Sequence, residues 1–100
     1  MKGAVWMAFR KLQGVNMPEE KQGAVRFACL TYGEQPKFIQ KKIDRLCHDV
    51  GGPYSAALRE VMCSKRSVTA ICMEHNVSES TLYRMRKKFY ESWYRKGRKA

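Results

Sequence analysis

The clearest pattern of apolar and polar positions lies between residues 67 and 89, where it predicts two short helices joined by a tight turn. Apolar side chains recur three or four residues apart, as on the buried face of a helix, at Val68, Ile71 and Cys72 and again at Leu82, Met85 and Phe89. Between these groups, Asn76 tolerates the left-handed conformation in which many helices end. Val77 follows as an apolar plug, and Ser78 can cap the second helix by accepting a backbone N–H.

This pattern predicts a helix-turn-helix, a motif that most often reads DNA. The small residue Cys72 stands where the helices would cross, and Asn76 follows four positions later. The outward side of the second helix would face the major groove, where Arg bonds guanine, Ser serves several bases and Glu accepts from cytosine. The predicted DNA-binding residues are Lys65, Arg66, Ser67, Ser78, Glu79, Ser80, Thr81, Tyr83, Arg84, Lys87 and Lys88. The alternative is a helical hairpin whose charged residues form an ordinary solvated surface.

The first fifty residues predict helices with less detail. Residues 3–15 could form a short helix ended by Gly14, or an arm on a partner subunit, through Val5, Trp6, Phe9 and Leu12. Pro18, Glu19 and Glu20 are typical of a helix start, because acidic side chains favour the positive end of the helix dipole. That helix would end at Gly33 and contribute to the core through Ala24, Phe27, Ala28 and Thr31.

Two further helices are predicted on either side of a tight corner at Gly51-Gly52-Pro53. The first opens at Pro36, and its apolar side carries Ile39, Ile43, Leu46, Cys47 and Val50. Its other surface carries Lys37, Lys41, Lys42 and Arg45, which suit either the phosphate backbone or a plain solvated surface. The second helix has an amphipathic pattern at Tyr54, Ala57, Leu58, Val61 and Met62, and Ser67 is a plausible N-cap for the helix that follows.

The fold class expected from these elements is all-α, with about four to five helices in one small domain and a C-terminal helix-turn-helix. Residues 1–50 would hold the N-terminal helices and a possible oligomerisation surface. Residues 53–94 would form a three-helix unit around the helix-turn-helix, and residues 95–100 a basic tail. At 100 residues the chain can bury only a modest core.

The charge balance favours a polyanionic partner. The chain holds 20 Lys and Arg against 9 Asp and Glu, a formal net charge of +11. Ten basic residues against three acidic ones lie between residue 65 and the end of the sequence. Duplex DNA carries about one negative charge per 1.7 Å of axis, so a surface of this kind attracts it. An anionic membrane surface is the competing partner.

The sequence gives no support for a metal site, a cofactor or catalysis. There is no C-x-x-C pair, and His48 and His75 do not lie at zinc-finger spacing. No nucleophile–base pair stands at a known motif spacing, so no enzyme is expected. No secretion signal or apolar run of about 20 residues is evident. The four cysteines are therefore interpreted as small buried apolar residues in a reducing cytoplasm, and no membrane or small-molecule partner is expected.

Basic and aromatic residues alternate from Lys87 to the end of the chain. Interleaved aromatic and basic side chains can stack on single-stranded bases, which would make the protein an RNA or single-strand binder. In the favoured interpretation, Phe89 and Trp93 dock on the core while the cations contact phosphates. The helix is expected to run to about Tyr94, and Gly97 lets the chain leave it.

The segment from about Ile43 to Phe89 resembles the PapB-type family, small bacterial regulators of fimbrial adhesin operons. The resemblance lies in the order of a helix ending near Cys47-His48, a helix with Ala57, Leu58 and Val61, a short basic turn, and the helix ending Ile71-Cys72-Met73-Glu74. The next helix begins beyond Val77 and carries Tyr83. The segment is also similar to KorA-type plasmid repressors.

The PapB resemblance implies a cytoplasmic, bacterial transcription regulator that oligomerises on operator DNA and is nucleoid-associated when bound. It implies a recognition-helix surface of Ser78, Glu79, Ser80, Tyr83 and Arg84. The function expected from the sequence is therefore sequence-specific binding of double-stranded DNA by a homo-oligomer, a dimer or higher. The alternatives are a plasmid or phage repressor of KorA type, an RNA or single-strand binder, and an interaction module for an acidic partner or anionic membrane.

Overall fold

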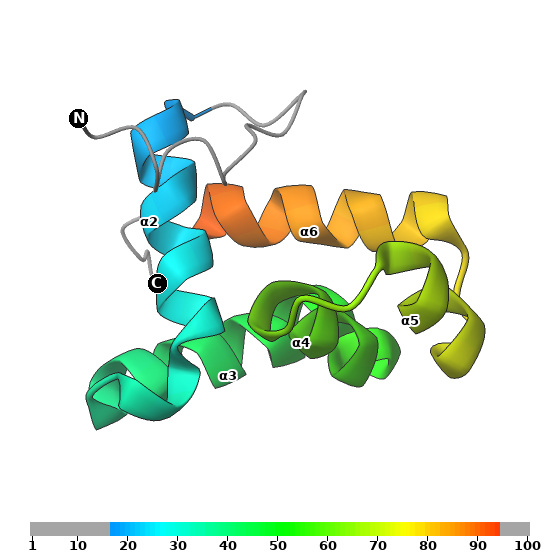
Figure 1. Cartoon of the computed structure of the whole chain (residues 1–100), viewed down its shortest axis with the longest axis horizontal. Helices are drawn as coiled ribbons and strands as arrows, with labels where there is room; N and C mark the ends of the chain where they lie inside the picture. Colours follow the sequence, from blue (N-terminus) through cyan, green and yellow to red (C-terminus); the bar gives the residue numbers. More distant parts are fainter. Residues whose placement is uncertain (1–16, 95–100) are drawn as a thin grey trace.

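A computed structural model describes residues 17–94, which are all-α, with no strand in this part of the chain (Figure 1). Its five α-helices are α2 (Glu19–Leu30), α3 (Lys37–Gly51), α4 (Ser55–Cys63), α5 (Val68–His75) and α6 (Glu79–Trp93). Single 3-10 turns at Tyr32–Glu34 and Gly52–Tyr54 lead into α3 and α4. The all-α prediction is confirmed, while the expectations for residues 3–15 and 95–100 lie outside the described residues.

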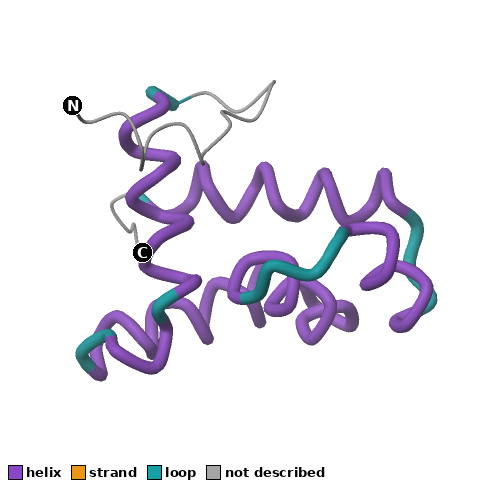
Figure 2. The backbone as a smooth tube through the Cα atoms, viewed as in Figure 1, coloured by secondary structure: helices purple, strands orange, loops and turns teal. Residues whose placement is uncertain are grey.

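Helix α4 is the centre of the arrangement. It packs against α2, α3, α5 and α6, so that every other described α-helix contacts it. The long helix α6 runs along one side of the molecule over α3 and α4, α2 lies across one end of α6, and α5 lies at the other end (Figure 1). Short loops connect successive helices (Figure 2). Helix α5 is therefore held to the rest of the fold mainly through α4 and α6.

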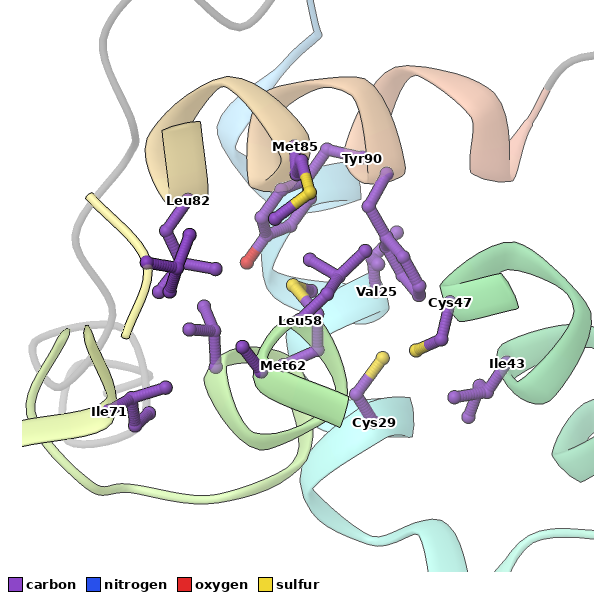
Figure 3. Close-up of a cluster of buried hydrophobic side chains, with 14 of the residues drawn as sticks. Val25, Cys29, Ile43, Cys47, Leu58, Met62, Ile71, Leu82, Met85 and Tyr90 are labelled. Atoms are coloured by element: carbon purple, nitrogen blue, oxygen red, sulfur yellow. The ribbon is translucent and has the colours of Figure 1, made fainter. Parts of the chain in front are cut away.

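The core is built around the buried side of α4. Leu58 and Met62 of α4 are fully buried and lie between Ile43 of α3 and Leu82 of α6 (Figure 3). Phe89 is the largest fully buried side chain. Burying a large apolar side chain of this kind contributes roughly 1.5–3 kcal/mol. The predicted buried faces of α3, α4 and α6 are confirmed at their central positions.

The predicted corner between α3 and α4 is also confirmed. Gly52 has a φ of +52°, a conformation in which an L side chain would be strained, so this turn requires glycine. A Cβ added to its neighbour Gly51 would come within 3.3 Å of the Leu58 Cδ2 atom. The two glycines thus allow α4 to fold back closely against the end of α3.

The prediction that α2 contributes to the core is confirmed, and Ala28 packs against the core as expected, but the predicted core positions Ala24 and Phe27 are wrong. Val25, Cys29 and Gln22 point inward and are fully buried, whereas Phe27 is 65% exposed and Ala24 is exposed. The spacing of apolar residues favoured the side with Phe27. The side of α2 that faces the core, however, also carries polar residues that form specific hydrogen bonds there. The Gln22 side chain donates to the backbone carbonyl of Met17 at 3.1 Å, and its neighbour in the next turn, Arg26, bonds to α4.

Arg26 closes the C-terminal end of α4. Its guanidinium donates to the carbonyl of Val61, to that of Met62 at 2.9 Å and to that of Ser64 at 3.1 Å. The last carbonyls of a helix lack intrahelical partners, and a cation there also opposes the negative end of the helix dipole. Arg26 therefore fixes α2 to α4 at the point where the chain leaves for α5.

The four cysteines are free thiols. Cys29, Cys47 and Cys72 are buried, as predicted, and Cys63 is half-buried. Burial raises the pKa of Cys47 to about 12. The interaction with Cys63 raises the pKa of Cys29, and the same interaction lowers that of Cys63. In the described part of the chain, no helix combines the length and apolar character needed to cross a bilayer.

Replacing Arg26 by Met is expected to lower the free energy of unfolding by about 2 kcal/mol, because it leaves carbonyls of α4 without a charged donor. Urea unfolding followed by circular dichroism measures the change. The matched control is Arg45→Met, which removes an exposed cation without an ion pair among the described residues and is expected to change stability by less than about 0.5 kcal/mol. Equal effects of the two substitutions would contradict the role given to Arg26.

Candidate nucleic-acid interface

The turn between α5 and α6 has the predicted geometry. Asn76 is left-handed, with φ 56° and ψ 49°, and it is the one non-glycine residue with positive φ among residues 17–94. The Val77 N–H donates to the Cys72 carbonyl at 3.1 Å, which satisfies an end group of α5. The Val77 side chain is buried in the core beneath the turn. These contacts fix the angle at which α6 leaves α5.

Serine caps begin both helices, as predicted. The Ser67 hydroxyl accepts from the backbone N–H of Ala70 at 3.1 Å. The Ser78 hydroxyl accepts from the backbone N–H of Thr81 at 3.2 Å and donates to the Thr81 hydroxyl at 2.8 Å. These two hydroxyls were predicted to bind DNA. In the structure they accept backbone N–H groups in the first turns of α5 and α6.

The buried side of α6 is wider than predicted. Leu82, Met85, Phe89 and Trp93 are buried as expected, and Tyr90, which was not predicted in the core, is buried with them. The Phe89 and Trp93 rings are in contact, with centroids 6.1 Å apart. Of the aromatic side chains on and next to this helix, Tyr83 and Tyr94 remain exposed. The prediction that Phe89 and Trp93 dock on the core is confirmed.

The opposite side of α6 carries exposed polar and basic residues. This surface, which we call the outer face of α6, consists of Ser80, Tyr83, Arg84, Lys87 and Lys88. None of its three cations forms an ion pair with a carboxylate in residues 17–94. The Arg84 guanidinium has a long contact of 3.4 Å with the Thr81 hydroxyl. The sequence correctly placed all five residues outside the core.

Arg86 supports this face from the side. Its guanidinium lies 5.0 Å from the centre of the Tyr83 ring, a cation–π contact that orients the tyrosine. Arg86 is half-buried, and this burial lowers its pKa. Arg86 is not among the predicted DNA-binding residues, because its position between the buried and exposed sides of α6 gives no clear periodicity.

Glu79 turns toward α5 rather than outward. Its carboxylate accepts a hydrogen bond from the Thr69 hydroxyl at 3.0 Å. This contact joins the first turn of α5 to the first turn of α6. Glu79 remains exposed, but one of its oxygens already has a partner, so its predicted contact with a base competes with the contact to Thr69.

The two basic residues before α5 differ in their surroundings. Lys65 is exposed and forms no ion pair among the described residues. Arg66 pairs with Glu60 at 2.7 Å and with Glu74, and this pairing lowers the pKa of the Glu74 carboxyl. The Arg66 charge is thus balanced within the protein, and a phosphate contact would have to displace carboxylates.

Glu60, Glu74 and His75 are the group in the described residues whose donor atoms, all within 4.8 Å of one another, lie close enough to share a metal ion. The His75 Nε2 atom is buried without a hydrogen bond and lies 3.6 Å from the Glu60 carboxylate. Arg66 already forms ion pairs with both carboxylates. The arrangement is accounted for as a charge network that joins the end of α4 to both ends of α5.

On α3, three of the four predicted basic residues are exposed. Lys37, Lys41 and Arg45 point to solvent, whereas Lys42 is half-buried. The Lys42 ammonium lies 4.4 Å from the centre of the Trp93 ring, and burial lowers its pKa. Lys42 therefore joins α3 to α6 and does not belong to the free basic surface predicted for it.

Comparisons of the chain with protein-family models, with curated proteins and with solved structures give no match. The resemblance to PapB-type and KorA-type regulators therefore stays a prediction, and the function has to be argued from the geometry of this chain.

The turn makes a direct prediction. Asn76→Ala is expected to lower the free energy of unfolding by about 1 kcal/mol, because the left-handed conformation is unfavourable for a residue with a plain Cβ. Asn76→Gly, the matched control, is expected to leave stability unchanged or to raise it, since glycine adopts positive φ freely. Urea unfolding of both variants measures the difference. An equal loss in both variants would show that the Asn76 side chain, not its backbone conformation, matters.

Proposed function

We propose that α5 and α6 form a helix-turn-helix that binds double-stranded DNA and reads its sequence with the outer face of α6. The observation that carries this proposal is that face itself. It presents Arg84, Lys87 and Lys88 to solvent without carboxylate partners in the described residues, together with Ser80 and Tyr83. The helix is held rigidly by its serine cap, by the left-handed turn and by its buried side.

Some residues of the outer face of α6 suit contacts with bases, and others suit contacts with phosphates. Arg84 and Ser80 are one turn apart, so both can reach the floor of a major groove that admits α6. The Arg84 guanidinium can donate two parallel hydrogen bonds to guanine. Lys87 and Lys88 lie toward the other end of the helix, where lysines on the groove wall contact phosphates and set the register.

Charge supplies the affinity in this proposal. The net charge of +11 favours association with a polyanion, and each phosphate neutralised releases counterions. A single α6 covers few base pairs, so we propose that the protein acts as a homo-oligomer on DNA. The exposed Phe27 and Phe38, 65% and 71% accessible, offer apolar surface for a second copy in the N-terminal half. Regulation of an adhesin operon remains the suggestion of the PapB resemblance.

Duplex DNA is favoured over single strands by the burial of aromatic side chains. A platform that stacks successive bases needs exposed rings in a row. Phe89, Tyr90 and Trp93 are buried. Tyr83 and Tyr94 are exposed, but each ring has a cation 5.0 Å from its centre, Arg86 at Tyr83 and Lys21 at Tyr94. The basic residues of the helix are thus better placed for a duplex than for stacked bases.

Two substitutions on α6 test the proposal. Arg84→Ala is expected to reduce the preference among duplex sequences by about 1–3 kcal/mol, because it removes a base contact. Lys87→Ala is expected to weaken binding to all sequences alike and to reduce the slope of log affinity against log salt by about 1. Fluorescence anisotropy titrations at several salt concentrations, with a set of duplexes, measure both quantities.

Arg84→Lys serves as the matched control, because it keeps the charge and removes the two-pronged donor. It is expected to lose the sequence preference and to keep the salt slope of the unchanged protein. If neither Arg84→Ala nor Lys87→Ala alters binding to duplex DNA, α6 is not the DNA-binding helix.

A further inference from the structure

A second unpaired basic surface lies on α3, away from the proposed site. Lys37, Lys41 and Arg45 follow one another at intervals of four residues, are all exposed, and form no ion pair with a carboxylate of residues 17–94. We call these three residues the α3 cation row. Of the two acids on α3, Asp44 pairs with Arg59 and accepts from the Tyr32 hydroxyl at 2.9 and 3.0 Å. Asp49, one turn beyond Arg45, is exposed and forms no ion pair in residues 17–94, so the row ends at Arg45.

Side-chain contacts fix the direction in which the row points. Ile43 is buried in the core, and the residues on either side of it contact different neighbours. Lys42 covers the Trp93 ring of α6, and Asp44 pairs with Arg59 of α4. Helices α6 and α4 therefore flank the buried side of α3. The row lies on the remaining side of α3, which faces solvent.

The row and the outer face of α6 point in different directions. Both α3 and α6 turn their buried sides to the same core, and α6 runs along one side of the molecule with α3 on the other (Figure 1). A straight duplex held against the outer face of α6 lies beyond α6 from that core. It leaves the α3 cation row uncovered, so a partner of the row must be a separate molecule or a distant segment.

We propose that the α3 cation row binds the phosphate backbone of a second DNA duplex, so that one protein holds two duplexes together. This inference rests on the proposed function of α6. Residues four apart rise about 6 Å along a helix, so the row spans about 12 Å. Duplex DNA carries about one negative charge per 1.7 Å of axis, so a row of this length faces several phosphates. The binding is independent of sequence, because no base is contacted.

The composition of the exposed side of α3 distinguishes DNA from an anionic membrane. A helix that lies in a membrane interface buries a broad apolar face. On α3 the one large apolar side chain that is strongly exposed is Phe38, beside charged and polar neighbours. A single phenylalanine is a weak membrane anchor, whereas phosphate binding by the row needs only exposed cations. The observations favour nucleic acid.

A two-duplex capture experiment with the full chain tests the proposal. The protein is bound to a bead-attached duplex, a fluorescent duplex of unrelated sequence is added, and its retention is measured. The variant K37Q/K41Q/R45Q is expected to bind the bead-attached duplex as the unchanged protein does and to retain about tenfold less of the fluorescent duplex. The control K37R/K41R/R45K keeps the charges and is expected to retain it fully. Circular dichroism confirms that the exposed substitutions leave the helices intact.

Each other outcome has a definite meaning. Equal capture by K37Q/K41Q/R45Q and the unchanged protein overturns the proposal, because bridging then runs through the α6 helices of associated copies. Failure of the unchanged protein to capture a second duplex also overturns it. A third outcome is that K37Q/K41Q/R45Q no longer binds the bead-attached duplex, whereas R84Q/K87Q/K88Q still does. This outcome contradicts the function proposed for α6, and it shows that the α3 cation row is a DNA-binding site. In a separate experiment, both proteins are mixed with phosphatidylserine vesicles. If K37Q/K41Q/R45Q loses vesicle binding but captures DNA as the unchanged protein does, the row is a membrane-binding surface.

Discussion

The whole arrangement depends on the burial of one short helix, α4, whose exposed end is closed by an arginine from elsewhere in the chain. Helix α4 contacts every other described α-helix, and Leu58 and Met62 lie at the centre of the core. Its C-terminal carbonyls are satisfied by Arg26 of α2. Because the chain passes directly from this point to α5, the position of the α5–α6 pair follows from how α4 is held.

A second constraint concerns the distribution of charge. Several acidic side chains of the described residues are engaged with neighbours in the same molecule: Asp44 with Arg59 and Tyr32, Glu60 and Glu74 with Arg66, and Glu79 with Thr69. These acids are not available to neutralise the cations on α3 and α6. Exposed cations without a carboxylate partner among residues 17–94 therefore remain on α3 and α6, and both proposals for binding depend on these cations.

The features that could be predicted from the sequence are those decided by neighbouring residues. The caps at Ser67 and Ser78, the left-handed turn at Asn76 and the corner at Gly52 depend on local backbone geometry, which residue type strongly favours. The apolar stripe of α6 was likewise evident, as was the exposure of its polar side. For the candidate site, the sequence therefore identified the helix α6 and the residues that the structure exposes on its outer face, while their role in DNA binding stays a prediction.

The errors arose where distant parts of the chain decide the outcome. The inward face of α2 depends on Arg26, whose carbonyl partners lie 35 to 38 residues away, so periodicity alone selected the side with Phe27. The packing of Lys42 on Trp93 joins helices that are far apart in sequence. The pairing of Arg66 with Glu60 and Glu74 also requires the folded arrangement of α4 and α5. Charge counts cannot show which cations remain free.

The central claim is that the outer face of α6 reads the sequence of duplex DNA. The most direct measurement is selection from a random-sequence duplex pool at increasing salt, followed by sequencing of the retained DNA. The account predicts an enriched motif that persists as salt weakens the phosphate contacts, and two half-sites about one helical turn apart if the bound form is a dimer. Retention of DNA without any enriched sequence would contradict it, and would show a protein that binds DNA through charge alone.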